Sequence, residues 1–181
     1  MIKPEDIHHF WFVEHGPKYW FAFNTEFDAR IASEFGSVHT QAMAGELFAW
    51  RSTSKGRLAE IIILDQFTRQ IYRKTPQAFS ADAMALVLAQ EMVLGNHDKD
   101  FNNQEKQFAY MPFMHSESIS MHNYALPLFK TISEQTFQFA LKHRDLIVKF
   151  GRYPYRNATL GRENTPAEEA YLLEQNSSFG Q

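Results

Sequence analysis

The chain has 181 residues, of which 44% are hydrophobic and 22% charged, and its formal net charge is −3. This length and composition are typical of one globular domain, and the negative charge argues against nonspecific binding to nucleic acid or to an anionic membrane. The absence of cysteine excludes disulfides, thiolate zinc sites and a cysteine nucleophile.

Two features of the sequence bear on its location. The N-terminal stretch carries acidic and histidine residues and has no apolar signal-peptide region. The longest purely aliphatic run is the IIIL at residues 61–64, which is much shorter than a membrane span. We therefore expect a soluble, cytoplasmic protein without a membrane partner.

The spacing of apolar residues predicts an all-α protein. The IIIL run resembles a β-strand when it is taken alone. Its flanks continue the apolar spacing well beyond strand length, so this segment is also predicted to be helical. Helices are expected over residues 25–35, 55–73, 80–95, 103–111, 116–132, 133–150 and 165–175.

Capping and breaking residues set the expected ends of these helices. Thr25 and Thr165 are expected near helix starts, the second in a capping box with Glu168. Gly151 is expected to end its helix in a left-handed conformation. Pro112 is expected to stop the helix that precedes it.

The connections between the predicted helices are short, so consecutive helices are expected to pack antiparallel as hairpins. No linker rich in proline, glycine or serine divides the chain. We therefore predict a single all-helical domain over residues 1–181.

The first polar cluster lies on an otherwise apolar helix. Asp65, Arg69 and Arg73 are spaced four residues apart, so they are expected to line one face of that helix. A charged stripe there is expected to be partly buried or to face a cleft. A surface salt-bridge stripe would explain Asp65 with Arg69, but it leaves Arg73 without an acid.

The second cluster is centred on His115, which is predicted to lie at the start of a helix capped by Ser116. Free N–H groups at a helix start favour an anion. His115, Glu117 and His122 could bind a metal by residue type, but their spacing matches no standard pattern, so no metal site is expected. If the protein is an enzyme, His115 and Glu117 form the best acid–base pair, because histidine titrates near neutrality and a carboxylate can orient it.

The third cluster places Arg152, Arg156 and Arg162 on a loop broken by glycine and proline, with no lysine between them. An arginine fork suits a carboxylate or a phosphate. A functional hypothesis has these arginines hold an anionic ligand. A structural hypothesis has them bonded internally, and its candidate partners are Asp65, Asp82, Glu117 and Glu168.

Several blocks of the sequence, in order, resemble a known family. LDQFTRQIYRKTPQAFSADAMAL, YMPFMHSE and HRDLIVKFGRYPYRNATLGRENTPAEEAYL, together with FWF and GELFAW, are similar to the signature blocks of a bacterial and plant family, domain of unknown function 924. The resemblance covers nearly the whole chain. It implies an all-helical fold similar to tetratricopeptide-repeat-like arrays of helical hairpins, and it implies no established activity.

The resemblance also gives weight to particular positions. The chain departs from the family at Thr68, Gln70 and Tyr155, where proline, asparagine and histidine are usual. The loss of the histidine argues against an essential acid–base role at position 155, and His122 falls outside the family pattern. The positions that match are Asp65, Gln66, Arg69, Arg73, Asp82, His115, Ser116, Glu117, His143, Arg152, Arg156, Asn157, Gly161 and Arg162.

The leading hypothesis is a pocket that binds a small phosphate or carboxylate ligand, and the sequence leaves open whether the protein is an enzyme. Trp11, Phe12 and Trp20 are candidate apolar walls. No cofactor is expected, because neither a dinucleotide fingerprint nor a P-loop is present. The alternative is a tetratricopeptide-like module that binds a peptide or protein, with the polar cluster as an ion-pair network. The expected ligand-binding residues are Asp65, Gln66, Arg69, Arg73, His115, Glu117, His143, Arg152, Arg156, Asn157 and Arg162.

Overall fold

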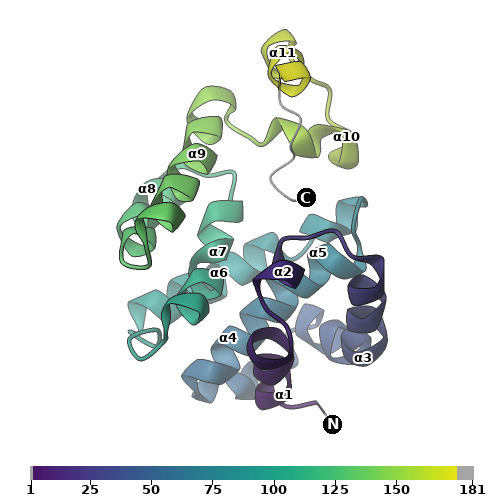
Figure 1. Ribbon diagram of the computed structural model, residues 1–181, viewed down its shortest axis with the longest axis vertical. Helices are drawn as coiled ribbons and strands as arrows, with labels where there is room; N and C mark the ends of the chain where they lie inside the picture. Colours follow the sequence, from purple (N-terminus) through teal and green to yellow (C-terminus); the bar gives the residue numbers. More distant parts are fainter. Residues whose placement is uncertain (1, 175–181) are drawn as a thin grey trace.

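A computed structural model of the chain describes residues 2–174. Within that range it contains helices and loops but no strand, so the predicted all-α class is confirmed. None of the helices in this range is both long and apolar enough to cross a membrane. The α-helices (Figure 1) are α1 (Pro4–His8), α2 (Pro17–Trp20), α3 (Thr25–Met43), α4 (Ser54–Ile62), α5 (Thr68–Ile71), α6 (Asp82–Leu94), α7 (Asn103–His115), α8 (Ile119–Lys130), α9 (Glu134–Phe150), α10 (Asn157–Leu160) and α11 (Pro166–Glu174).

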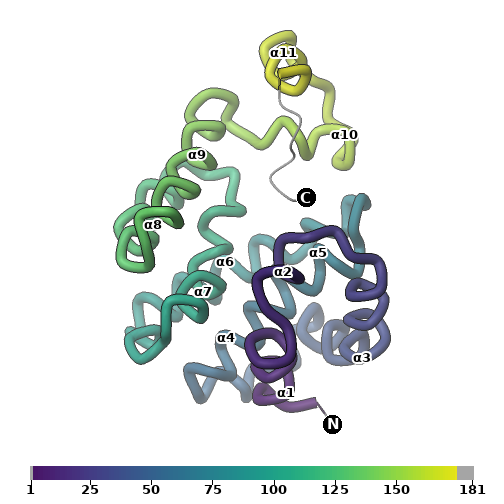
Figure 2. The backbone as a smooth tube through the Cα atoms, viewed as in Figure 1, coloured from purple at the N-terminus to yellow at the C-terminus, as the bar shows by residue number. Residues whose placement is uncertain are grey.

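Helix α4 contacts helices from both halves of the chain, namely α1, α6 and α7. Helix α3 packs against α5, and each of α6, α7 and α8 packs against the helix that follows it. Figures 1 and 2 show α8 and α9 side by side along one edge, with α10 and α11 at the end far from the N-terminus. From α6 to α9 consecutive helices are therefore neighbours, as their short connections predict, whereas α1 packs against α4 and α3 against α5.

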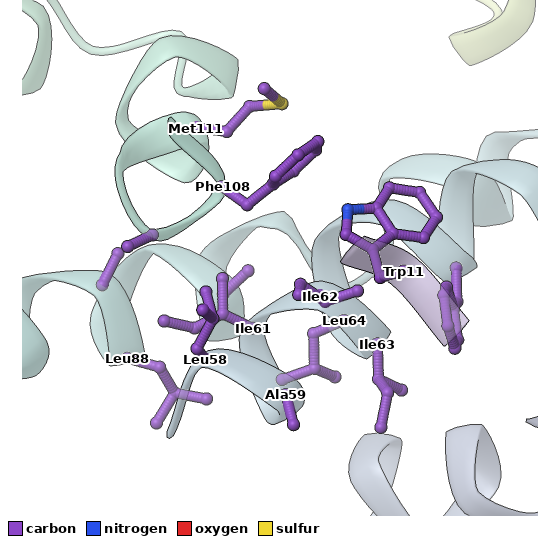
Figure 3. Close-up of a cluster of buried hydrophobic side chains, with 14 of the residues drawn as sticks. Trp11, Leu58, Ala59, Ile61, Ile62, Ile63, Leu64, Leu88, Phe108 and Met111 are labelled. Carbon is purple, nitrogen blue, oxygen red and sulfur yellow. The ribbon is translucent and has the colours of Figure 1, made fainter. Parts of the chain in front are cut away.

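The main hydrophobic core surrounds α4 and the turn that follows it. The four residues of the IIIL run are each at most 1% exposed. Figure 3 shows Trp11 from the N-terminal segment and Phe108 from α7 beside this run. A helical segment that is apolar on every side is one that the fold buries on every side. This burial explains why the run resembles a β-strand in the sequence although it is helical.

The helix predicted over residues 55–73 is not one regular helix. It consists of α4, a π-helical turn at Ile63–Phe67, and α5. Asp65, within the π turn, still contacts Arg69 at the predicted spacing, because Nη1 of Arg69 donates to the carbonyl of Asp65 at 3.4 Å and Nη2 lies 3.8 Å from Oδ1. Asp65 is buried at 1% exposure, and Arg73, beyond the end of α5, donates to both carboxylate oxygens of Asp28 at 2.7 and 2.9 Å. Turns of this kind are frequent at functional sites.

The prediction that a helix stops before Pro112 is wrong. Helix α7 continues through Pro112 to His115, and α8 starts only at Ile119 with Ser118 as its N-cap. A proline inside a helix costs about 3 kcal/mol. Every residue from Phe108 to His115 is buried, so tertiary packing offsets this cost. Local breaking signals alone could not reveal that packing.

Most other predicted ends agree with the structure to within a few residues, but the helix predicted over 25–35 continues to Met43. Gly151 follows α9 with a φ of 71°, in the predicted left-handed conformation. Thr165 and Glu168 form the predicted capping box of α11, while the predicted last residue, Gln175, lies outside the described range. Helix α3 is longer than predicted, and its N-cap is Asn24 instead of Thr25.

Candidate functional site

A buried aspartate orients His115. The Nδ1 atom of His115 lies 2.7 Å from Oδ1 of Asp65, and Gln66 donates to the other oxygen of Asp65 at 2.5 Å. Since an ionised carboxylate only accepts, Nδ1 carries the proton and Nε2 is left as the basic nitrogen. Nε2 has no hydrogen-bond partner among the described residues. This arrangement is that of an oriented histidine base.

Electrostatics set the charge of this pair. Burial would raise the pKa of Asp65, but His115 and Arg69 outweigh it and hold the pKa below its usual range. Burial and the Arg69 guanidinium lower the pKa of His115, against the opposing effect of Asp65. At neutral pH the pair is therefore an ionised aspartate and a neutral imidazole.

His115 does not lie where the sequence predicts. It is the last residue of α7 and not the first of a helix. The end of a helix carries partial negative charge, which disfavours an anion. Positive charge near His115 comes instead from arginine side chains of other segments. Arg69 is the nearest of these to the pair, with Nη2 at 3.8 Å from Oδ1 of Asp65.

Two arginines share Asp82, the first residue of α6. Arg69 donates to both oxygens of Asp82, at 2.7 and 3.1 Å. Arg156 reaches the same carboxylate with Nη1 alone, at 3.3 Å from Oδ2. One carboxylate therefore joins α6, α5 and the loop before α10, and it engages only one N–H group of Arg156.

The rest of the Arg156 guanidinium is enclosed but not hydrogen-bonded. The residue is 4% exposed, and its Nε and Nη2 atoms have no hydrogen-bond partner among the described residues. Aromatic rings flank the group, with the centroid of Phe79 at 4.7 Å and that of Tyr153 at 4.6 Å from Cζ. Nε and Nη2 form the side-on fork with which arginine grips a carboxylate or phosphate.

The predicted partner of His115, Glu117, is engaged elsewhere. Both its oxygens accept from Arg162, at 2.7 and 2.9 Å, and it also accepts from the backbone N–H of Tyr153 at 2.8 Å. Burial would raise the pKa of Glu117, but these donors outweigh it and lower the pKa. The carboxylate that contacts His115 is Asp65. The predicted His115–Glu117 pair therefore does not form, and His115 pairs with Asp65 instead.

The remaining arginines of the loop have structural contacts. Arg162 also donates to the side chain of Asn157 at 2.9 Å, and Asn157 is fully buried. Arg152 donates to both oxygens of Glu168, at 2.7 and 2.8 Å, and so anchors α11. Asp82, Glu117 and Glu168 therefore do pair with loop arginines, as the structural hypothesis has it, whereas Asp65 contacts Arg69 of α5. The unfilled fork of Arg156 is what that hypothesis leaves unexplained.

His143 lies in a buried aromatic group beside Tyr153. It is 5% exposed, its Nδ1 lies 2.8 Å from the carbonyl oxygen of Phe139, and its ring centroid is 5.9 Å from that of Tyr153. His122 packs on the same tyrosine at 6.3 Å. Burial lowers the pKa of His143 to about 4, so this histidine is neutral at physiological pH.

The aromatic walls expected from the sequence lie elsewhere. Trp11, Phe12 and Trp20 pack around Phe108 in the main core. The rings at the arginines are those of Phe79 and Tyr153, which sequence reasoning did not single out although both lie inside the quoted blocks. Among residues 2–174, no three acidic, histidine or cysteine side chains cluster closely enough to hold a metal ion.

Comparisons with known proteins agree with the resemblance noted in the sequence. A family model described as a bacterial protein of unknown function, domain of unknown function 924, matches residues 7–176. A comparison with curated proteins gave no match. The structure is similar to that of ATU0120, a protein of unknown function from Agrobacterium tumefaciens, with a TM-score of 0.91, 34% sequence identity and coverage of 95% of this chain and 97% of that one. The family model spans most of the chain, which therefore belongs to the bacterial family of domain of unknown function 924.

Proposed function

We propose that the protein binds a small carboxylate or phosphate through the side-on fork of Arg156. The observation that carries this proposal is that Nε and Nη2 of this guanidinium are buried without a partner. A buried donor left unsatisfied costs about 1–3 kcal/mol, and more when the group is charged. An anion of the right geometry would remove that cost.

The surroundings of Arg156 favour such a ligand. The Phe79 and Tyr153 rings hold the plane of the guanidinium, so little side-chain freedom remains to be lost on binding. Asp82 accepts from both Arg69 and Arg156, and it engages Arg156 through Nη1 alone, so the fork of Arg156 is not used by this carboxylate. The Glu117 and Glu168 carboxylates already pair with Arg162 and Arg152.

His115 is linked to Arg156 through Asp65, Arg69 and Asp82, and we propose it as the acid–base group of the same site. Its Nδ1 is committed to Asp65, so Nε2 is the atom that exchanges a proton with a bound ligand. The lowered pKa of His115 keeps it neutral near pH 7, which makes it a base in the resting protein. The proposal thus extends to an enzyme in which Arg156 positions an anionic substrate and His115 takes up a proton.

The test is thermal unfolding of the protein with inorganic phosphate, methyl phosphate, acetate and benzoate. A ligand at a hundred times its dissociation constant adds about 2.7 kcal/mol of stability, which raises the melting temperature measurably. The gain is expected for at least one anion class and is expected to disappear in Arg156→Lys, which keeps the charge but loses the fork.

The matched control is Arg144→Lys, because Arg144 is a partly exposed arginine outside this cluster and donates to Asn123 at 2.7 Å. This variant is expected to keep the full gain. If none of the anions stabilises the wild-type protein, or if Arg156→Lys gains as much as the wild type, the proposal is wrong.

A second candidate function is supported by the succession of packed neighbours from α6 to α9. We propose, as the alternative, that these helices form a tetratricopeptide-like superhelical array that binds a peptide or protein partner. Its arginines would then meet an acidic peptide. The same unfolding assay with acidic decapeptides separates the two proposals: stabilisation by peptides but not by small anions favours the array.

A further inference from the structure

A small cavity lies where the end of α5 faces α10. Its volume is about 90 Å³, and a single water needs only about 10–15 Å³ of such space. The cavity therefore has room for one phosphate or carboxylate group. No acidic side chain of the described residues lines it, and the lining residues that matter here are Arg69, Arg73, Lys74, Phe79, Tyr155 and Thr159.

The three cations of this lining are not equally neutralised. Arg69 pairs with Asp82 and Arg73 with Asp28. Lys74 forms no ion pair with the described carboxylates, and its ammonium lies over the Phe23 ring at 5.4 Å. The Nε atom of Arg69 is buried and has no hydrogen-bond partner among the described residues. The cavity thus offers positive charge and a donor that its own protein contacts do not use.

The backbone of Lys74 supports a requirement for that charge. Its φ is 63°, in the left-handed region that non-glycine residues seldom adopt. Asparagine or glycine would hold this conformation at lower cost, so the lysine at this position runs against the local backbone preference. Such an outlier is a reason to look for a function at the position.

The cavity is close to the fork of Arg156. The Phe79 ring contacts both guanidinium groups, with its centroid 4.7 Å from Cζ of Arg156 and 5.6 Å from Cζ of Arg69. These distances place the two Cζ atoms no more than about 10 Å apart. Both arginines also donate to Oδ2 of Asp82. One small molecule can therefore reach both places.

We infer that the cavity is a second anion subsite, and that the ligand carries two terminal oxyanion groups joined by a short spacer. The inference rests on the proposed function, because the fork of Arg156 holds the first group. The cavity holds the second, with Lys74 as its counter-ion. The Phe79 ring lies between the two positions and favours an apolar spacer.

Isothermal titration calorimetry of the full chain tests this assignment. The probes are inorganic phosphate and acetate, each compared with a bifunctional analogue, 1,3-propanediol bisphosphate and glutarate. The bifunctional probe of the preferred class is expected to bind at least about tenfold more tightly, because the second group binds at high effective concentration. The two pairs of probes distinguish a phosphate from a carboxylate ligand.

Lys74→Asn is the diagnostic variant, because asparagine tolerates the left-handed backbone and removes the charge. It is expected to lose the gain of the bifunctional probe and to keep the affinity for the monofunctional one. Lys99→Asn, in an exposed turn, is the control and is expected to lose neither.

The outcomes separate this inference from the proposed function. If the bifunctional probe gains nothing in the wild type, or keeps its gain in Lys74→Asn, the second subsite is overturned while a dependence of phosphate binding on Arg156 still stands. If monofunctional binding survives Arg156→Lys but is lost in Lys74→Asn, the proposed function falls and the cavity remains as an anion site. If no probe binds, both are overturned.

Discussion

Replacing His143 by glutamine is expected to make the protein less sensitive to acid. His143 is 5% exposed in α9, and burial lowers its pKa to about 4, against the opposing effect of its hydrogen bond with the carbonyl of Phe139. Glutamine keeps an N–H group that can donate to the carbonyl of Phe139, but its side chain does not titrate. Comparing the wild type with His143→Gln therefore isolates the effect of one proton, which His143 binds in the unfolded chain but not in the folded protein.

The sign and size of the effect follow from proton linkage. An unfolded histidine has a pKa of about 6.5. Between that value and about 4, the unfolded chain binds a proton at position 143 that the folded protein does not. The free energy of unfolding therefore falls as the pH falls through this window. The loss from pH 8 to pH 4.5 amounts to roughly 2.5 kcal/mol.

Urea unfolding at pH 8 and at pH 4.5 measures this difference. Burial also lowers the pKa values of His39 and His122, so the wild-type protein loses stability from several sites. The prediction concerns the difference between the two proteins. From pH 8 to pH 4.5 the free energy of unfolding should fall by roughly 2.5 kcal/mol more in the wild type than in His143→Gln. The control His9→Gln alters an exposed histidine and should behave as the wild type. Equal losses in the wild type and in His143→Gln would refute the reasoning.

Two further predictions concern ion pairs that do not involve Arg69 or Arg156. Arg51→Met leaves the fully buried carboxylate of Glu60 without its two donors at 2.7 Å, and urea unfolding should show a loss of at least about 2 kcal/mol in the free energy of unfolding. The control is Arg144→Met, at a partly exposed arginine. A loss in Arg51→Met no larger than that in Arg144→Met would contradict this prediction. Glu168→Ala removes both the cap of α11 and the partner of Arg152. Amide hydrogen exchange over residues 166–174 should accelerate while that of α7 does not change, and unaltered protection of α11 would show that Glu168 does not anchor it.

Local sequence signals predicted most helix ends. Gly151 ends α9 in the left-handed conformation that only glycine adopts readily. Thr165 and Glu168 cap α11 through atoms three residues apart. These features depend on the backbone within one turn, so the residues that cause them are adjacent in the sequence.

Tertiary packing overrode the same kind of signal at two places. Helix α7 passes through Pro112 because the surrounding residues are buried. A π-helical turn at Ile63–Phe67, which contains Asp65, divides the predicted single helix. Neither feature can be deduced from residues within one helical turn.

The sequence by itself determined the helical class, most helix positions and the set of charged residues that gather near the C-terminal loop. Only the tertiary structure decided which charges meet. Asp65 and His115 are fifty residues apart in the chain, and Glu117 binds Arg162 although it stands two residues from His115. An arginine pairs equally well with any carboxylate by residue type, so the choice depends on which side chains the packed helices bring within hydrogen-bond distance. That geometry is also what leaves the fork of Arg156 open.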